Sequence, residues 1–353
     1  MSDAKTQPFT LSTSRGFHDW LALIGGSLAF TTYQAGKLFF LGLKPDGSLS
    51  IFERSFPRCM GLGVSDDGRT LVLATQVQLI RFDNVLAKGE RQGIHDAVYA
   101  PHASWVTGDL DIHDVGIGSD QRPLFVNTLF NCLATVSEGH SFRPLWRPPF
   151  ISRLVAEDRC HMNGMATEKG QPRYVSCVSQ SDVTDGWRDR RMSGGLVIDV
   201  QTGEPVVEGL SMPHSPRLHD GRLWILNSGT GEFGWVDTVR GSFSPMVFCP
   251  GYARGLALTG RYAVVGLSRA RENRTFRGLA LDDALIRHNV DPRCGLIVID
   301  LKDGTVAEWV RIEGIVDELY DVAILPRVTC PALIGFKGVD VRRVISIDEN
   351  VRA

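Results

Sequence analysis

The chain has 353 residues, a formal net charge of −2 at pH 7 and a hydrophobic fraction of 43%. This balance is typical of a globular protein with a large core, and the near-neutral charge gives no support for nucleic acid or a membrane surface as the main partner. No run approaches the roughly 20 consecutive apolar residues that a membrane-spanning helix needs. The seven cysteines are scattered without a CxxC pair, which favours reduced thiols in a cytoplasmic protein over a disulfide framework.

The first residues of the chain differ from the rest. Residues 1–16 lack the apolar core of a secretory signal and are predicted to be a disordered lead-in. After them, short runs of strand-forming residues alternate with turns such as Asp46-Gly47, and Asp-Gly is a strong hairpin signal. The first such runs are 28–33, 37–41 and 49–52. We therefore predict one all-β domain over 17–353.

A unit of strand, turn and strand recurs along the chain. In one copy the strand 61–64 leads through the turn 66–68 to the strand 70–74. The residues that precede the first strand of each copy are Met60, His113, Asn163, His214, Arg254 and Tyr320. Successive copies therefore start 53, 50, 51, 40 and 66 residues apart. Repeats of about 40–50 residues with several short strands are typical of propeller blades, so six copies predict a six-bladed β-propeller.

The two ends of the chain are predicted to share one blade. The runs over 28–52 have no matching inner strand, while the copy that starts at Tyr320 has few strands after it. Joining the N- and C-terminal strands in one blade closes the ring and removes exposed strand edges. Residues 270–292 interrupt the fifth copy and are predicted to form a loop with a short helix.

Two rings of side chains are predicted at the mouth of the central channel. Because side chains alternate along a strand, residues two positions apart share a direction. The residues that precede the inner strands form the mouth ring, which is Met60, His113, Asn163, His214, Arg254 and Tyr320. Two positions earlier lies the second ring, which is Arg58, Asp111, His161, Met212, Tyr252 and Glu318. Ten of these twelve residues are polar or charged, and a concave cluster of this kind predicts a ligand or metal site.

The histidines carry the most specific prediction. His113, His161 and His214 are predicted to hold a metal ion, with Glu318 or Asp111 as an additional oxygen ligand. Three neutral imidazoles with an open position suit Zn, Fe, Cu or Mn. A single histidine at the start of a strand is ordinarily a turn or core residue, but three at repeat-related positions favour a shared site. His161 belongs to the second ring, so a shared site requires the segment before its strand to reach differently from its neighbours.

The remaining residues of the rings are assigned to catalysis and to substrate binding. Arg254 is predicted to hold an anionic substrate group and Tyr320 to donate a proton, with Glu318 as a further catalytic residue. The predicted substrate-binding residues are Asp111, Asn163, Arg217 and Arg58.

The predicted function is a metal-dependent enzyme that acts on a small molecule or a peptide side chain at the channel. Oxidoreductase chemistry is favoured because a histidine-rich site suits Fe or Cu, and a metal-dependent hydrolase or lyase is one alternative. The other alternative is a non-catalytic propeller whose loops, including 140–150 and 270–292, bind a protein or peptide partner.

Four segments together resemble a bacterial family of uncharacterised proteins. They are Thr107–Asp114, Trp146–Ser152, Asp158–Gly164 and Ser211–Arg217. The resemblance extends over about 17–345 and implies a propeller-like fold in a soluble bacterial protein, without a named reaction. More distantly, the blade pattern is similar to strictosidine synthase-like and gluconolactonase-like six-bladed propellers, whose sites lie at the central channel. Their metal ligands include carboxylate and amide oxygens, and the histidine-rich set of this chain departs from that pattern.

Overall fold

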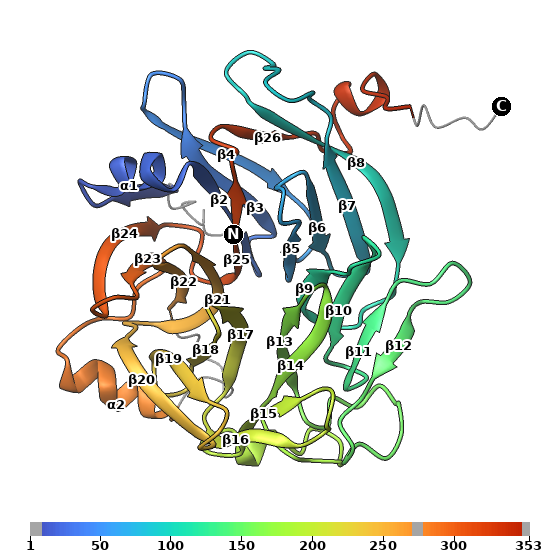
Figure 1. Ribbon diagram of the computed structural model, residues 1–353, viewed down its shortest axis with the longest axis vertical. Coiled ribbons are helices and arrows are strands. Elements are labelled where there is room, and N and C mark those ends of the chain that lie inside the picture. Colours follow the sequence, from blue (N-terminus) through green and yellow to red (C-terminus); the bar gives the residue numbers. More distant parts are fainter. Residues whose placement is uncertain (1–8, 270–277, 348–353) are drawn as a thin grey trace, which may run out of the picture.

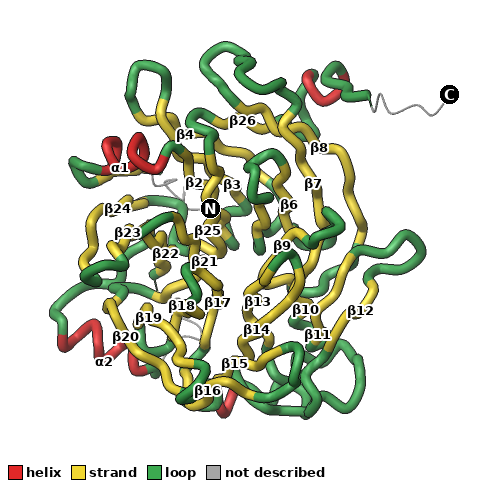
Figure 2. The backbone as a smooth tube through the Cα atoms, viewed as in Figure 1, coloured by secondary structure: helices red, strands yellow, loops and turns green. Residues whose placement is uncertain are grey.

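The computed structural model describes residues 9–269 and 278–347 and confirms the six-bladed β-propeller. Six sheets surround one axis, and each contains four antiparallel strands that lie side by side from the axis outward. The inner strands of the sheets face one another across the axis (Figure 1). Helices lie only at the periphery in the tube view (Figure 2). No helix of the described ranges is long and apolar enough to cross a membrane.

The blades are numbered here in chain order, and their strands are given from the axis outward. Blade 1 has β25 (Leu319–Pro326), β2 (Gly26–Thr32), β3 (Lys37–Leu43) and β4 (Leu49–Ser55). Blade 2 has β5 (Leu62–Val64), β6 (Thr70–Ala74), β7 (Gln78–Asn84) and β8 (Ala97–Val106), and blade 3 has β9 (Ile112–Ile117), β10 (Pro123–Asn127), β11 (Cys132–Thr135) and β12 (Arg143–Trp146). Blade 4 has β13 (Met162–Glu168), β14 (Gln171–Cys177), β15 (Gly195–Asp199) and β16 (Pro205–Leu210). Blade 5 has β17 (Pro213–His219), β18 (Arg222–Asn227), β19 (Glu232–Asp237) and β20 (Ser242–Phe248), and blade 6 has β21 (Tyr252–Thr259), β22 (Tyr262–Ser268), β23 (Gly295–Asp300) and β24 (Thr305–Glu313).

Blade 1 closes the ring in the predicted way. Its inner strand β25 comes from the C-terminal part of the chain and pairs with β2, with Ala29 opposite Ala323 in an antiparallel register. Two short strands then extend the outer edges of other blades. β1 (Thr10–Thr13) pairs with β24 of blade 6, and β26 (Pro331–Leu333) lies parallel to β8 of blade 2.

Strand β1 corrects the prediction of a disordered lead-in over 1–16. Its four residues pair with Val310–Glu313, so the chain in this region covers a strand edge that would otherwise expose its backbone groups. The strand could not be recognised from its own residues, because the alternation of Phe9 and Leu11 is too short and the pairing partner is distant in the sequence. Residues 1–8 of the predicted lead-in lie outside the described residues.

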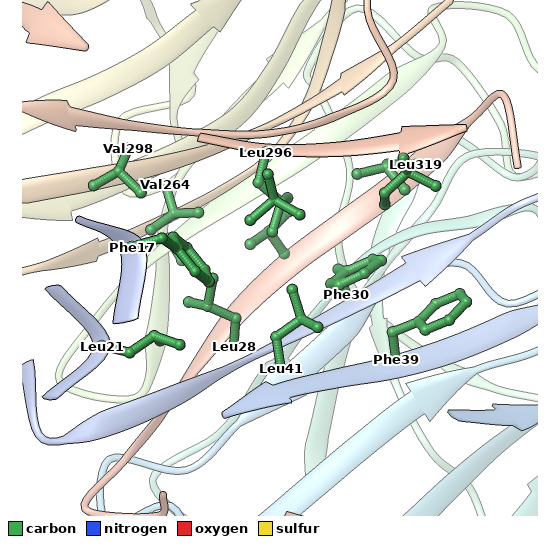
Figure 3. Packing of buried hydrophobic residues seen from close by; sticks show 14 of the residues in the cluster. Phe17, Leu21, Leu28, Phe30, Phe39, Leu41, Val264, Leu296, Val298 and Leu319 are labelled. Carbon is green, nitrogen blue, oxygen red and sulfur yellow. The ribbon is translucent and has the colours of Figure 1, made fainter. Parts of the chain in front are cut away.

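Apolar side chains fill the spaces between neighbouring blades. One cluster joins blade 6, blade 1 and the helix α1 (Phe17–Ile24), which packs Phe17 and Leu21 against the sheets (Figure 3). Phe30 stacks on Phe39 at 5.0 Å between ring centroids within this cluster. All seven cysteines are free and buried. Each blade is thus held by its two neighbours, which leaves the polar residues of the inner strands facing the axis.

The described residues contain three further helical segments, two in connections between strands and one after β26. The helix predicted within 270–292 is α2 (Ala280–Arg287), and residues 270–277 of that prediction lie outside the described ranges. The 3₁₀ turns are Arg188–Arg190 and Asp340–Arg342. Segment 140–150, considered as a partner-binding loop, contains β12, the outer strand of blade 3.

A hydroxyl group at the end of the second strand of a blade, or just after it, fixes the start of the next inner strand. Thr128 donates to the carbonyl of Met162 at 2.7 Å, and this joins blade 3 to blade 4. The same contact joins other blades through Thr31, Ser228 and Ser268, whose acceptors are the carbonyls of Met60, Ala253 and Leu319. The segments that carry the mouth ring are therefore anchored by neighbouring blades.

Candidate functional site

The inner strands change register at the mouth ring. The pairing shifts between Ile112 and Val115 in β9, where His113 and Asp114 together face one residue of β10. Inner strands β13, β17, β21 and β25 have corresponding shifts at their own starts. A β-bulge re-aims side chains and is frequent beside functional sites. Because of the bulge, the side chains of two consecutive residues of one strand can lie at different levels of the channel.

The structure buries the polar residues of the mouth ring. His113, Asn163, His214, Arg254 and Tyr320 are between 2% and 8% exposed. Polar groups are seldom buried this completely without a specific set of partners, because their desolvation is costly. The predicted ring is thus a buried polar cluster at the axis.

A left-handed backbone position explains how His161 reaches this cluster. His161 has a φ of 51°, and the equivalent second-ring residues Arg58, Asp111 and Met212 have φ values of 48°, 53° and 47°. Such a conformation costs a non-glycine residue roughly 1–2 kcal/mol, so its recurrence in four blades is a feature of the repeat. The turn brings His161 against His113 of the preceding blade, with ring centroids 4.9 Å apart.

Two residues that the sequence did not single out position His161. Asp158 accepts a hydrogen bond from Nδ1 of His161 at 2.8 Å and another from Nε1 of Trp187 at 2.9 Å. The Trp187 ring also stacks on the imidazole at a centroid distance of 4.1 Å. Burial opposes ionisation of Asp158, but His161 and its other partners hold the pKa of this carboxyl below its ordinary value. His161 is therefore fixed by a charged acceptor and by an aromatic surface.

Each of the three predicted metal-binding histidines uses Nδ1 for a structural hydrogen bond. Nδ1 of His113 lies 2.9 Å from the carbonyl oxygen of Asp111 and 2.9 Å from the hydroxyl of Thr128. Nδ1 of His214 lies 2.8 Å from the carbonyl oxygen of Met212. Because a carbonyl or carboxylate can only accept, Nδ1 carries the proton and Nε2 of a neutral ring keeps its lone pair.

The environment keeps two of these imidazoles neutral. Burial lowers the pKa of His113 to about 4, against a smaller raising effect of Asp111. Burial also lowers the pKa of His214 well below its ordinary value, and the cation of Arg254 acts in the same direction. At pH 7 both side chains therefore present a lone pair instead of a charge.

Arg254 and Glu318 form the charged side of the cluster. Nη1 of Arg254 donates to Oε1 of Glu318 at 3.0 Å, and both side chains are less than 10% exposed. The guanidinium lies 5.3 Å from the ring centroid of Tyr252 and 5.0 Å from that of Tyr320. Tyr320 in turn contacts His113 edge to face at 5.5 Å. The three residues predicted to be catalytic are thus adjacent to one another and to a histidine.

The predicted three-histidine metal centre is not assembled in this conformation. Across residues 9–269 and 278–347, no group of three or more His, Cys, Asp or Glu side chains is arranged to hold a metal ion. His113 and His161 are in ring contact, whereas the ring of His214 contacts Tyr252 at 5.6 Å. The structure brings together a pair of the histidines, and the metal ligand set stays a prediction.

Asp111 and Arg58 lie at the outer rim of the cluster. The side chain of Asp111 is 34% exposed, and Arg58 forms an ion pair with Asp109. The Arg58 guanidinium also lies 5.8 Å from the ring centroid of Tyr33, which stacks on Tyr320. These two predicted substrate-binding residues therefore sit beside the mouth ring, next to solvent.

Arg217 lies deeper in the channel, apart from the other predicted substrate-binding residues. It forms a bidentate ion pair with Asp114, in which Nη1 and Nη2 donate to the two carboxylate oxygens at 2.7 and 3.0 Å. Nη2 also lies 3.7 Å from Oδ1 of Asp321. These three residues are called the axial hub below. The guanidinium also donates to the carbonyl oxygens of Met165, Pro216 and Leu256. With its hydrogen bonds used in this way, Arg217 holds the structure together.

The axial hub links all six inner strands. Its own residues belong to β9, β17 and β25, and Asp114 and Arg217 reach β13 and β21 through Met165 and Leu256. Asp321 accepts a hydrogen bond from the backbone N–H of Leu62, just at the start of β5. Beyond the hub, Asp114 and Arg217 line a cavity of about 730 Å³ at the other end of the channel.

Comparison with known proteins supports the fold and a family without a known function. No curated protein matches the sequence. A chain of a nidogen–laminin complex has a TM-score of 0.55 at 11% identity, covering 86% of this chain and 99% of that chain. A protein of unknown function from Bacteroides caccae has a TM-score of 0.49 at 11% identity, covering 85% and 98%. Virginiamycin B lyase from Staphylococcus aureus has a TM-score of 0.39 at 11% identity, covering 87% and 100%.

The similarity to the chain of the nidogen–laminin complex concerns the propeller fold alone, because the sequences are too different for a shared site to follow. The family assignment is more specific. Residues 15–334 match the family described as a domain of unknown function, DUF4915. This agrees with the resemblance to an uncharacterised family that the four sequence segments indicated. The chain therefore belongs to the DUF4915 family.

Proposed function

We propose that this protein is a metal-dependent enzyme whose active site is the histidine cluster at the mouth of the channel. In the proposal, Nε2 of His113 and Nε2 of His161 are the first two metal ligands. The supporting observation is the fixed Nδ1 of each ring, which donates to a backbone carbonyl or to a carboxylate. Metal-binding histidines show this arrangement almost without exception, because it fixes the tautomer and the ring orientation.

The chemistry of the donor set also fits a transition metal. Imidazole nitrogen suits Zn, Fe, Cu or Mn, and the 4.9 Å between the two ring centroids allows both rings to approach one ion. His214 would have to turn away from Tyr252 to become the third ligand. Such an ion supplies Lewis-acid or redox chemistry. We favour an oxidoreductase because the proposed ligand atoms are imidazole nitrogens, which suit Fe or Cu.

The remaining residues are assigned roles by their positions. Asp158 would hold His161 in place, since it accepts the Nδ1 proton and is itself bound by Trp187. Tyr320 would donate a proton to the substrate, because its hydroxyl is buried beside His113 and Arg254. Arg254 and Glu318 would orient Tyr320 and exclude water from the cluster, since both are buried and paired with each other.

Titration of metal-free protein with Zn²⁺, Fe²⁺, Cu²⁺ and Mn²⁺ tests this proposal. We expect one equivalent of at least one of these ions to bind. The variants His113→Ala and His161→Ala should each lose this binding. His219→Ala is the matched control, because His219 lies on the other side of the axial hub, near Gly260. Absence of stoichiometric binding, or equal loss in the control, would exclude the proposed site.

A further inference from the structure

Asn163, His214 and Tyr320 of the mouth ring each have a buried polar atom without a hydrogen-bond partner among the described residues. These atoms are Oδ1 of Asn163, Nε2 of His214 and the hydroxyl of Tyr320. Their residues are only 2%, 3% and 5% exposed. Each buried polar atom without a partner costs about 1–3 kcal/mol, so three at one level of the channel require an explanation.

The three atoms are held in place by bonds that their own residues make elsewhere. Nδ2 of Asn163 donates to the carbonyl of Pro213 at 3.0 Å, which directs Oδ1 as the remaining acceptor. Nδ1 of His214 donates to Met212, which leaves Nε2 as the second acceptor. Tyr320 is stacked on Tyr33 at 5.5 Å, and its hydroxyl can both donate and accept. The ring thus offers two acceptors and one donor.

The charges around these atoms disfavour an anionic ligand group. Arg254 is the positive charge of the mouth ring, and it is already paired with the buried carboxylate of Glu318. A carboxylate brought to this level would have to be desolvated beside an arginine that is already paired, and it has no N–H donor for Asn163 or His214. This differs from the anionic substrate group that the sequence predicted for Arg254.

We infer that Asn163, His214 and Tyr320 bind a neutral carboxamide group of the substrate. The inference rests on the proposed function, since it names the substrate class of the same site. A carboxamide has two N–H donors and one carbonyl acceptor, which is the complement of the three atoms. The two N–H groups would bind Oδ1 of Asn163 and Nε2 of His214, and the carbonyl would accept from Tyr320. His214 then serves recognition, while His113 and His161 remain the metal ligands.

Three small planar probes of similar shape test the inference. Acetamide is neutral, acetate is an anion and acetamidinium is a cation, and each is titrated into metal-free protein labelled with ¹⁵N in its histidines. Acetamide should shift the Nε2 resonance of His214, because the lone pair accepts a hydrogen bond. Acetate and acetamidinium should bind at least about tenfold more weakly, which corresponds to about 1.4 kcal/mol. Equal affinity of all three probes, or tighter binding of acetate, overturns the inference.

Matched variants separate recognition from a structural effect. Tyr320→Phe removes one hydroxyl and keeps the ring, so it should weaken acetamide binding about tenfold and leave metal binding unchanged. Tyr33→Phe makes the same chemical change in the stacked neighbour and should leave acetamide affinity unchanged. If metal binds and acetamide does not, the inference fails and the proposed function stands. If acetamide binds to a protein that takes up no metal, the proposed function fails and the inference stands.

Discussion

At the residue scale, the pair of Asp158 and His161 distinguishes this cluster from a ring of ordinary buried histidines. A histidine that only fills a turn needs no charged acceptor, and burial of a carboxylate beside it is costly. Asp158 is nevertheless only 17% exposed in its side chain, and it is bound by both His161 and Trp187. The arrangement resembles the carboxylate–histidine support of metal ligands.

Replacing Asp158 by asparagine tests this support. Asp158→Asn removes the negative charge and keeps the shape, so Nδ1 of His161 loses its charged acceptor. We expect metal affinity to fall about 10–100-fold, the range observed for such supporting residues. The measurement is a metal titration by calorimetry. Asp185→Asn is the control, because Asp185 is an exposed partner of Arg188. Unchanged affinity in Asp158→Asn would show that this carboxylate does not support a ligand.

The ring positions could be predicted from the sequence, whereas their supporting residues could not. His113 and His214 follow from the repeat, since equivalent positions of successive blades face the same axis. His161 belongs to the second ring in the sequence, and its contact with His113 could not be predicted because it depends on side-chain packing with Trp187 and Asp158. Asp158 lies three residues before His161, a spacing that could have suggested a carboxylate–histidine pair. Trp187 comes from a long connection whose path no periodic pattern determines.

At the element scale, the bulged inner strands connect the site with the axial hub. In β9 the consecutive residues His113 and Asp114 go to the mouth ring and to the hub, and in β25 Tyr320 and Asp321 do the same. Alternation alone predicted the mouth ring but not the hub, because it treats each strand as regular. The contacts of Arg217 with Asp114 and with three backbone carbonyls therefore could not be predicted, and its role in substrate binding stays a prediction.

Loss of the hub arginine should destabilise the propeller strongly. Arg217→Met leaves the buried carboxylates of Asp114 and Asp321 without their cation. Removing one partner of a buried ion pair costs about 3–5 kcal/mol, and we expect a loss of this size in the free energy of unfolding. Chemical denaturation measures it, with Arg240→Met as the control, since the Arg240 side chain is 82% exposed. A loss below about 1 kcal/mol would contradict the role of the hub.

The hub should also make stability depend on pH. Burial and the neighbouring Asp114 raise the pKa of Asp321 to about 7, against a lowering by Arg217. Between about pH 4 and pH 7 the folded protein keeps this proton while the unfolded chain loses it. The Asp321 contribution therefore falls as pH rises, by at most about 1.4 kcal/mol per pH unit, and becomes constant above pH 7.

Denaturation of the wild type and of Asp321→Asn at several pH values isolates this contribution. The difference in unfolding free energy between the two proteins should change between pH 4 and pH 7 and stay constant from pH 7 to pH 9. A difference that is constant from pH 4 to pH 9 would show that Asp321 titrates alike in both states. Absolute stability is a poorer readout, because asparagine cannot accept from both Leu62 and Val322 as the carboxylate does.

At the scale of the whole molecule, the repeat spacing and the unmatched strands at both ends were sufficient to predict the closed ring. The additional edge strands β1 and β26 were not predicted, because each has few residues and gains its structure from a distant partner. The central channel is a consequence of the ring, and the hub separates its polar mouth from the cavity at the other end. Within the described residues, the buried histidine cluster therefore lies at one end of the channel and the cavity at the other.

The location of a bound metal ion would show directly whether the histidine cluster at the mouth of the channel is a metal site. Crystals of the protein grown with the ion that binds in solution would be measured at the absorption edge of that metal. We expect one anomalous-scattering peak at the mouth of the channel, from an ion bonded to Nε2 of His113 and Nε2 of His161 at about 2.0–2.1 Å for zinc. A peak at other residues, with both of these imidazoles unbound, would contradict this expectation.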